Sequence, residues 1–262
     1  MPITVQTYDE MMSKNEGALC LFYGPTGVGK TVSLLQSMPE PFFYVRSEPR
    51  ETKRSMRAIK SSRKMKLVDY DEFDDLMSWL SDFRNLKGSR GLIVDSLSHL
   101  MNVRLSGEVQ EQAYEARDDK TKARKTLVQQ VKLTEEGYGA IGGNMYRLTQ
   151  ILMKISTELN MVVACTASED SRPKWNRELI GAPAFVGKMY SNNFPGFFDL
   201  IGRVSTMVGT SGENEGKIIY PPRVDFRSPD DSFIAKATGD MRKTVYPFNI
   251  KKILQIERGT DH

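Results

Sequence analysis

A short glycine-rich segment has the residue types and spacing of a phosphate-binding loop. It matches the pattern G-x-x-x-x-G-K-[ST], follows an apolar run and precedes a segment with helical character. Glycines let such a loop wrap until successive backbone N–H groups point at phosphate oxygens, and the helix N-terminus adds positive potential. A plain glycine turn is the alternative, but it needs neither the lysine nor the flanking strand and helix. We expect ATP to bind at Gly24, Pro25, Thr26, Gly27, Val28, Gly29, Lys30, Thr31 and Val32.

Two side chains of this loop and one later carboxylate have the chemistry of a magnesium-nucleotide site. Lys30 supplies a positive charge near the β- and γ-phosphates, and Thr31 offers its hydroxyl to Mg²⁺. Asp95 ends the apolar run Leu92–Val94, so it is expected at the carboxyl edge of a sheet, where ligands of open α/β folds bind. The alternative for Asp95 is a strand-end residue that caps the next helix. The sequence therefore predicts Mg²⁺ at Thr31 and Asp95.

A second carboxylate, Glu48, directly follows another predicted strand. At the same edge it could polarise a water molecule for in-line attack on the γ-phosphate. The alternative is a surface glutamate that pairs with Arg50 or Lys53. Both interpretations stay open on the sequence alone.

The apolar pattern predicts the elements that position these residues. Strands are expected at 18–23, 42–45, 66–68, 91–95 and 161–166, and helices at 73–80 and at 145–159, the latter after a break at Gly142-Gly143. This alternation predicts an α/β fold with a mostly parallel sheet covered by helices on both faces. A C-terminal β extension is expected at 200–208, 217–220 and 233–235. We predict one domain over residues 1–262, with long insert or loop segments at 102–143 and 168–198.

Composition excludes several classes of protein. With 39% hydrophobic and 27% charged residues among 262, the chain is not disordered, collagen-like or a disulfide-stapled miniprotein. Apolar runs such as Met161–Cys165 are far shorter than the roughly 20 residues of a membrane helix, and no secretory signal is recognisable. Cys20 and Cys165 lie in apolar segments, which is typical of reduced, buried thiols. We expect a cytoplasmic protein without a membrane partner.

The net charge of +4 conceals an uneven distribution. Residues 46–66 hold nine basic and two acidic residues, a local net charge of +7. This run is either a solvated helix face or a surface for a phosphate backbone. The segment 168–198 interleaves bases with aromatic residues, which suits single-stranded nucleic acid. The alternative is that its aromatic side chains pack onto the sheet.

The order of these motifs resembles RecA-like ATPases, most closely the short phage-type members related to single-strand-annealing recombinases. The resemblance covers nearly the whole chain and rests on Leu21–Thr31, Glu48, Leu92–Leu100, Val162–Glu169 and Phe233–Lys236. It implies a RecA-like P-loop NTPase core. It also implies that Glu48 is the catalytic glutamate and that Ser168 senses the γ-phosphate. Lys236 would then reach into the nucleotide of a neighbouring subunit, and the segments 102–143 and 168–198 would face DNA.

The sequence departs from that family at several positions. Relatives often have Asp where Arg46 stands, and His or an amide where Ser168 stands. The expected inter-subunit arginine position holds Thr238, with Arg242 or Lys243 as substitutes slightly further along. Ser96, and not the glutamate of many ring-forming ATPases, follows Asp95.

The resemblance implies a Mg²⁺-dependent ATPase that binds single-stranded DNA in recombination or replication. It also implies self-association into a ring or filament, a single-strand-binding protein as a partner, and the host cytoplasm as the location if a phage encodes the chain. Two alternatives stay open. One is a nucleotide-regulated assembly factor with weak hydrolysis, and the other is a motor for DNA unwinding or packaging.

Overall fold

The structure is a computed structural model of the chain. It describes residues 17–48, 57, 63–115, 133, 135–174, 177–208, 215, 217–228, 231–237, 241 and 244–260; of 113–115, 171–174 and 177–180 it describes the backbone alone. Most of the basic run that follows Glu48, as well as Trp175, Thr238, Arg242 and Lys243, lies outside these residues.

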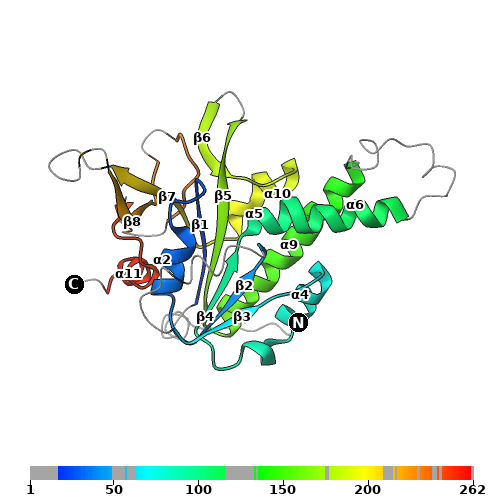
Figure 1. Ribbon diagram of the computed structural model, residues 1–262, viewed down its shortest axis with the longest axis horizontal. Helices are drawn as coiled ribbons and strands as arrows, with labels where there is room; N and C mark the ends of the chain where they lie inside the picture. Colours follow the sequence, from blue (N-terminus) through cyan, green and yellow to red (C-terminus); the bar gives the residue numbers. More distant parts are fainter. Residues whose placement is uncertain are drawn as a thin grey trace, which may run out of the picture.

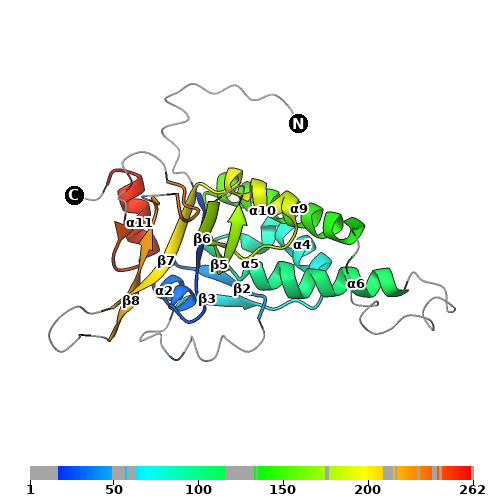
Figure 2. The ribbon, with the colours of Figure 1, turned by 90° about the horizontal axis from the view of Figure 1, so that it is seen from above.

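A mostly parallel sheet forms the centre of the molecule (Figures 1 and 2). Its strand order is β3-β2-β4-β5-β1-β7-β8-β9, with parallel pairing from β3 to β7 and antiparallel pairing from β7 to β9. A ninth strand, β6, pairs antiparallel with the outer part of β5. The strands are β1 (Ala18–Gly24), β2 (Phe42–Arg46), β3 (Met65–Val68), β4 (Gly91–Asp95), β5 (Val162–Lys174), β6 (Arg177–Pro183), β7 (Leu200–Val208), β8 (Ile218–Asp225) and β9 (Thr244–Val245).

Helices cover both faces of this sheet. Figure 2 shows α2 (Lys30–Ser37) on the face opposite α4 (Phe73–Ser81), α9 (Glu135–Glu158) and α10 (Lys188–Asn193). The remaining helical segments are α5 (Leu97–His99), the π-helix η2 (Leu100–Leu105), α6 (Ser106–Glu115), α11 (Ile250–Glu257) and the 3₁₀ turns η1 (Phe83–Leu86) and η3 (Phe194–Gly196). The predicted α/β fold, with its parallel sheet and C-terminal antiparallel extension, is confirmed.

The hydrophobic core has two halves, one on each face of the sheet. In β1, Leu19, Leu21 and Tyr23 belong to the half under α4 and α9, whereas Cys20 and Phe22 belong to the half under α2 and α11. Successive side chains of a strand point to opposite faces, so a strand buried on both sides is apolar throughout. Cys20 and Cys165 are buried free thiols, and burial raises the pKa of each. Among the described residues, no helix is both long and apolar enough to span a bilayer.

Two predictions about the later part of the chain are wrong. Phe233–Ala235 forms no strand, because Phe233 and Lys236 make only isolated bridges. The helix expected after Gly142-Gly143 begins earlier, at Glu135, and runs through both glycines. The described residues of the two long segments include regular elements: the rest of η2, α6 and the first part of α9 within 102–143, and the β5–β6 hairpin, α10 and η3 within 168–198.

Three aromatic residues of the segment 168–198 pack inside the molecule. Phe185, Tyr190 and Phe194 are almost fully buried, and their rings contact one another edge-on or tilted. Tyr190 also shares a hydrogen bond with Thr149 of α9. These three rings are therefore core residues and not stacking surfaces for nucleic-acid bases.

The two glycines of α9 give a matched test of its helical structure. An alanine methyl at Gly143 would meet nothing within 4 Å, whereas one at Gly142 would lie 3.1 Å from Met189 Cε. Gly143→Ala should raise the free energy of unfolding by about 0.5–1 kcal/mol, because alanine favours helix over glycine. Gly142→Ala should gain less, since Met189 has to move. Urea denaturation measures both, and a loss of stability in Gly143→Ala would contradict a continuous helix.

Candidate functional site

The predicted phosphate-binding loop connects β1 to α2 at the carboxyl edge of the sheet. Gly24 lies so close to β7 that an added Cβ would overlap the Val204 carbonyl oxygen. Gly29 precedes α2 with φ +94°, a left-handed conformation that glycine adopts without steric cost. The neighbouring backbone of β7 therefore requires glycine at position 24, and the left-handed backbone conformation favours glycine at position 29.

The Lys30 side chain folds back over the loop. Its Nζ donates hydrogen bonds to the carbonyl oxygens of Gly24, at 2.7 Å, and Pro25, at 2.9 Å. The ammonium group therefore lies against the segment whose backbone would surround the phosphates. A phosphate oxygen is a stronger acceptor for a charged donor than a neutral carbonyl, so Lys30 is positioned to exchange these bonds for phosphate contacts.

Asp95 is the buried carboxylate on which three parts of the site converge (8% exposed). Its Oδ2 accepts hydrogen bonds from Thr31 Oγ1, at 2.7 Å, and from the Tyr44 hydroxyl, at 2.9 Å. Its Oδ1 accepts a short hydrogen bond from Thr166 Oγ1. These donors come from the start of α2, from β2 and from β5, and together they satisfy a carboxylate that would be costly to bury alone.

The adjacent Thr31 hydroxyl and Asp95 carboxylate fit the demands of Mg²⁺. This ion binds oxygen ligands and in nucleotide sites takes one or two from the protein, with the rest from phosphates and water. Within the described residues, no group of three or more His, Cys, Asp or Glu side chains could hold a metal without such help. Thr31 and Asp95 are therefore the protein groups suited to an ion that arrives with a nucleotide.

Glu48 lies beside the end of β4, as the hypothesis of a second carboxylate at this edge requires. Its Oε1 accepts a hydrogen bond from Ser96 Oγ, at 3.4 Å, and lies 3.7 Å from the His99 Nδ1 atom. The Ser96 Oγ in turn accepts from the His99 backbone N–H, and the Ser47 N–H donates to the Asp95 carbonyl oxygen. The chain segments that carry Glu48 and Asp95 are thus bonded to each other. The alternative partners Arg50 and Lys53 lie outside the described residues.

The structure brings Ser168 to the loop but keeps Lys236 away from it. Ser168 is opposite Gly24 in the β1–β5 ladder, and its N–H donates to Ser98 Oγ. The Lys236 ammonium donates to the carbonyl oxygens of Pro195 and Phe198, which precede β7. Because β1 and β7 are parallel, these carbonyls lie toward the edge of the sheet opposite the loop.

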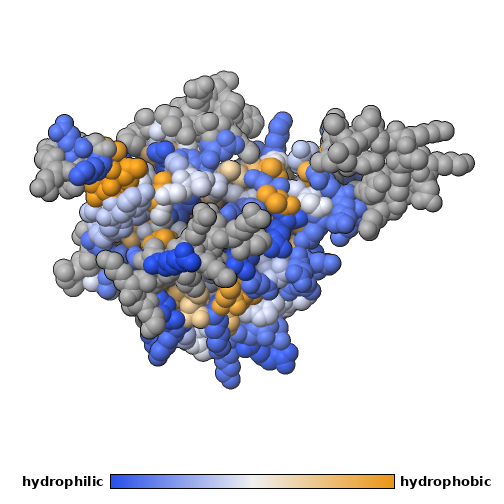
Figure 3. Space-filling model, viewed as in Figure 1, coloured by the Kyte–Doolittle hydropathy of each residue, from blue (hydrophilic) through white to orange (hydrophobic). Residues whose placement is uncertain are grey.

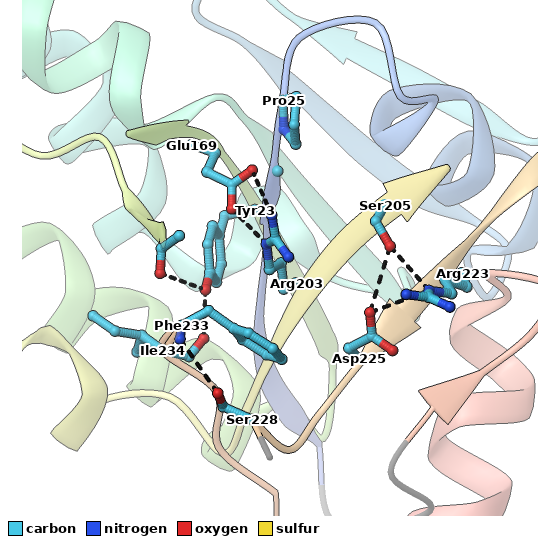
Figure 4. Close-up of polar contacts among 12 residues, drawn as sticks. Tyr23, Pro25, Glu169, Arg203, Ser205, Arg223, Asp225, Ser228, Phe233 and Ile234 are labelled. Atoms are coloured by element: carbon cyan, nitrogen blue, oxygen red, sulfur yellow. Dashed lines mark hydrogen bonds and ion pairs between the residues drawn. The ribbon is translucent and has the colours of Figure 1, made fainter. Parts of the chain in front are cut away.

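An ion pair next to the loop is missing from our sequence prediction. Arg203 of β7 binds Glu169, which directly follows Ser168, with Nε and Oε1 2.5 Å apart (Figure 4). The Arg203 guanidinium also lies over the Phe233 ring, 5.3 Å from its centre. Burial lowers the pKa of Arg203, but the hydrogen bond and charge of Glu169 outweigh it and raise the net pKa. The guanidinium therefore stays charged.

The neighbouring Tyr23 of β1 connects this region to two later segments. Its hydroxyl lies 2.7 Å from the carbonyl oxygen of Ile234 and 3.2 Å from that of Gly181 (Figure 4). Burial, followed by the nearby Glu169 carboxylate, raises the pKa of Tyr23 and keeps the hydroxyl protonated as a donor. The strand that leads into the loop is therefore bonded to β6 and to the segment around Ile234.

The other polar residues that we missed share one property, a place on a strand or turn next to Asp95. Tyr44 and Thr166 were hidden as polar positions inside apolar strands, and only the strand order reveals that they flank β4. The sequence gives a weak indication for Ser96 and His99, because both follow Asp95 within one helical turn and could therefore lie near its carboxylate.

Comparison with known protein families finds a match over most of the chain. The family model described as "AAA domain" matches residues 16–236. This range contains the loop, both carboxylates, Ser168 and the Arg203–Glu169 pair. A comparison with curated proteins finds no significant match.

Two tyrosines give a matched test of the hydrogen bonds at Asp95. The Tyr44 hydroxyl donates to the Asp95 carboxylate at 2.9 Å, and the Tyr70 hydroxyl donates to Ser47 Oγ at 3.3 Å. Tyr44→Phe should lower the free energy of unfolding by about 1.5–3 kcal/mol, the range for hydrogen bonds to charged groups, and Tyr70→Phe by about 0.5–1.5 kcal/mol. Equal losses in urea denaturation would show that Asp95 is not the stronger partner.

Proposed function

The chain is a nucleotide-binding P-loop ATPase that belongs to the AAA domain family, and on this premise we propose that it hydrolyses ATP with Mg²⁺ while bound to single-stranded DNA in recombination or replication. The observation that carries the hydrolytic part is the convergence of Lys30, Thr31 and Asp95 at one edge of the sheet, with Glu48 held beside Asp95 through Ser96.

Each of these groups has a separate task in the proposed reaction. The loop N–H groups and Lys30 bind the phosphates and stabilise the charge that develops as the bond to the γ-phosphate breaks. Glu48 orients a water molecule in line with that bond and accepts its proton. Thr31 and Asp95 hold the Mg²⁺, which when bound neutralises charge on the phosphate oxygens. Ser96 and His99 position Glu48.

The proposal of DNA binding rests on the motif order and on the β5–β6 hairpin. This hairpin extends beyond the carboxyl edge of the sheet (Figure 1) and includes Arg172, Lys174 and Arg177 in its sequence. It begins one residue after Ser168, which is opposite Gly24 of the loop. A change at the nucleotide would therefore reach the hairpin through a short length of strand.

Self-association into a ring or filament is also part of the proposal. Lys236 is a poor candidate for the residue that reaches a neighbouring nucleotide, since its ammonium group binds carbonyl oxygens of its own chain. Arg242 and Lys243, which lie outside the described residues, are the other candidates. The proposed single-strand-binding partner rests only on the resemblance to recombinases.

A second candidate function is a nucleotide-regulated assembly factor with weak hydrolysis. It is favoured by Arg46, which stands where relatives often have an acid and here forms a two-bonded ion pair with Asp69. A DNA motor for unwinding or packaging is a third. Turnover that is slow and unaffected by DNA supports the assembly factor, whereas strand displacement supports the motor.

Replacement of Glu48 separates nucleotide binding from hydrolysis. Glu48→Gln should reduce ATP turnover at least ~100-fold, the usual contribution of a general base, while ATP affinity stays within a few-fold of wild type. Lys30→Ala should lose both ATP turnover and ATP affinity. Glu135→Gln, on the exposed first turn of α9, is the matched control and should change neither. Normal turnover in Glu48→Gln or Lys30→Ala would exclude this site as the source of hydrolysis.

Salt dependence tests the proposed DNA binding. The logarithm of the affinity for single-stranded DNA should fall linearly with the logarithm of salt concentration, with a slope of about −0.7 for each neutralised phosphate. Single-stranded DNA should also stimulate ATP turnover. Trp175→Ala should weaken binding without changing the slope, because a stacking residue neutralises no phosphate. Affinity that does not depend on salt would argue against a phosphate-based interface.

A further inference from the structure

A bulge in β8 lies against the end of the phosphate-binding loop. Between the paired residues Ser205–Arg223 and Met207–Ile219, β8 advances four residues while β7 advances two. The extra residues lie in the segment 220–222. A Cβ added at Gly29 would lie 3.5 Å from Pro222 Cδ and 3.9 Å from Tyr220 Cδ1. Bulges near functional sites often redirect a side chain, and this one brings an aromatic ring to the start of α2.

The Tyr220 side chain is exposed although it lies close to the end of the loop. It is 58% exposed, whereas Pro222 beside it is buried. Exposed Val208 and Ile218 form a ladder pair further out on the same hairpin, and Figure 3 shows hydrophobic surface over this part of the molecule. A solvent-facing ring next to a phosphate-binding loop is the arrangement that a flat aromatic ligand would use.

The strand order determines which end of a nucleotide would reach this ring. β4, which carries Asp95, lies two strands from β1 on one side, and β8 lies two strands from β1 on the other. Hydrolysis requires the γ-phosphate near Asp95 and Glu48. The α-phosphate and the nucleoside attached to it then leave the loop on the side of β8.

We propose that Tyr220 is the stacking surface for the nucleobase of the bound nucleotide. This inference rests on the proposed placement of the phosphates at residues 24–31. Stacking on an aromatic face is open to every nucleobase, since each has a π-face. Tyr220 therefore contributes affinity for a nucleoside di- or triphosphate over inorganic phosphates, and contributes little to the choice among bases.

The test compares the binding of ADP with the binding of inorganic pyrophosphate. Both ligands contain a diphosphate group, and neither is the substrate of the proposed hydrolysis. Calorimetric titration with Mg²⁺ present measures both. Tyr220→Ala should weaken ADP binding by about 5- to 150-fold, the range for loss of one stacked base, and leave pyrophosphate binding within about twofold. Tyr220→Phe should retain ADP affinity within a few-fold, since the ring and not the hydroxyl makes the contact.

Tyr246→Ala is the matched control. Tyr246 is also an exposed tyrosine of the C-terminal extension (41% exposed), and none of its atoms is among those nearest Gly29. The Tyr246→Ala variant should bind both ligands like wild type. Unchanged ADP affinity in Tyr220→Ala would overturn the inference while the phosphate site stands. Equal weakening of both ligands would also overturn it, since Tyr220 would then act through the shape of the loop. A wild-type protein that binds neither ligand would overturn the proposed function as well.

Discussion

The site depends on one buried carboxylate, Asp95, and on the three hydroxyl groups that donate to it. Thr31, Tyr44 and Thr166 come from different elements, so their hydrogen bonds fix the start of α2 and two neighbouring strands relative to the end of β4. An unpartnered carboxylate at this depth would cost several kcal/mol by order of magnitude, which makes any arrangement without these donors unfavourable. The same bonds keep one carboxylate oxygen beside the Thr31 hydroxyl, where a metal ion that accompanies a nucleotide would bind. Stability and proposed chemistry thus depend on the same atoms.

The other candidate functional residues lie along the carboxyl edge of the sheet. Glu48 and Asp95 lie on one side of the phosphate-binding loop, Tyr220 lies on the other, and Ser168 stands opposite the loop itself. Parallel pairing brings most of these residues together, because β1, β2 and β4 end at the same edge of the sheet. Tyr220 comes from the antiparallel β8, which begins at that edge. The Tyr23 hydroxyl then connects the loop strand to β6, and the Arg203–Glu169 pair connects β7 to the start of the β5–β6 hairpin. A nucleotide at the loop is in this way next to the segment proposed to contact DNA.

The fold and the centre of the site could be predicted from the sequence because their signals are local. Apolar runs gave the positions of the parallel strands, and the loop motif with its strand-end carboxylate gave Lys30, Thr31, Asp95 and Glu48. What could not be predicted depends on strand order, as with Tyr44 and Thr166, or on packing that overrides propensity. The glycine pair of α9 predicts a break, but burial of Met145, Leu148 and Leu152 on one helix face outweighs it. The aromatic residues of 168–198 were ambiguous, since core packing and base stacking use the same side chains.

The central claim is that Asp95 and Thr31 bind a divalent ion only together with a nucleotide. Electron paramagnetic resonance of Mn²⁺, a magnetic substitute for Mg²⁺, tests it directly. In wild type, Mn²⁺ should bind tightly only when ADP is present, and its spectrum should show coupling to the phosphorus nuclei. Asp95→Asn, checked by circular dichroism to be folded, should lose this ADP-dependent binding. Equally tight, phosphorus-coupled Mn²⁺ in folded Asp95→Asn would contradict the account.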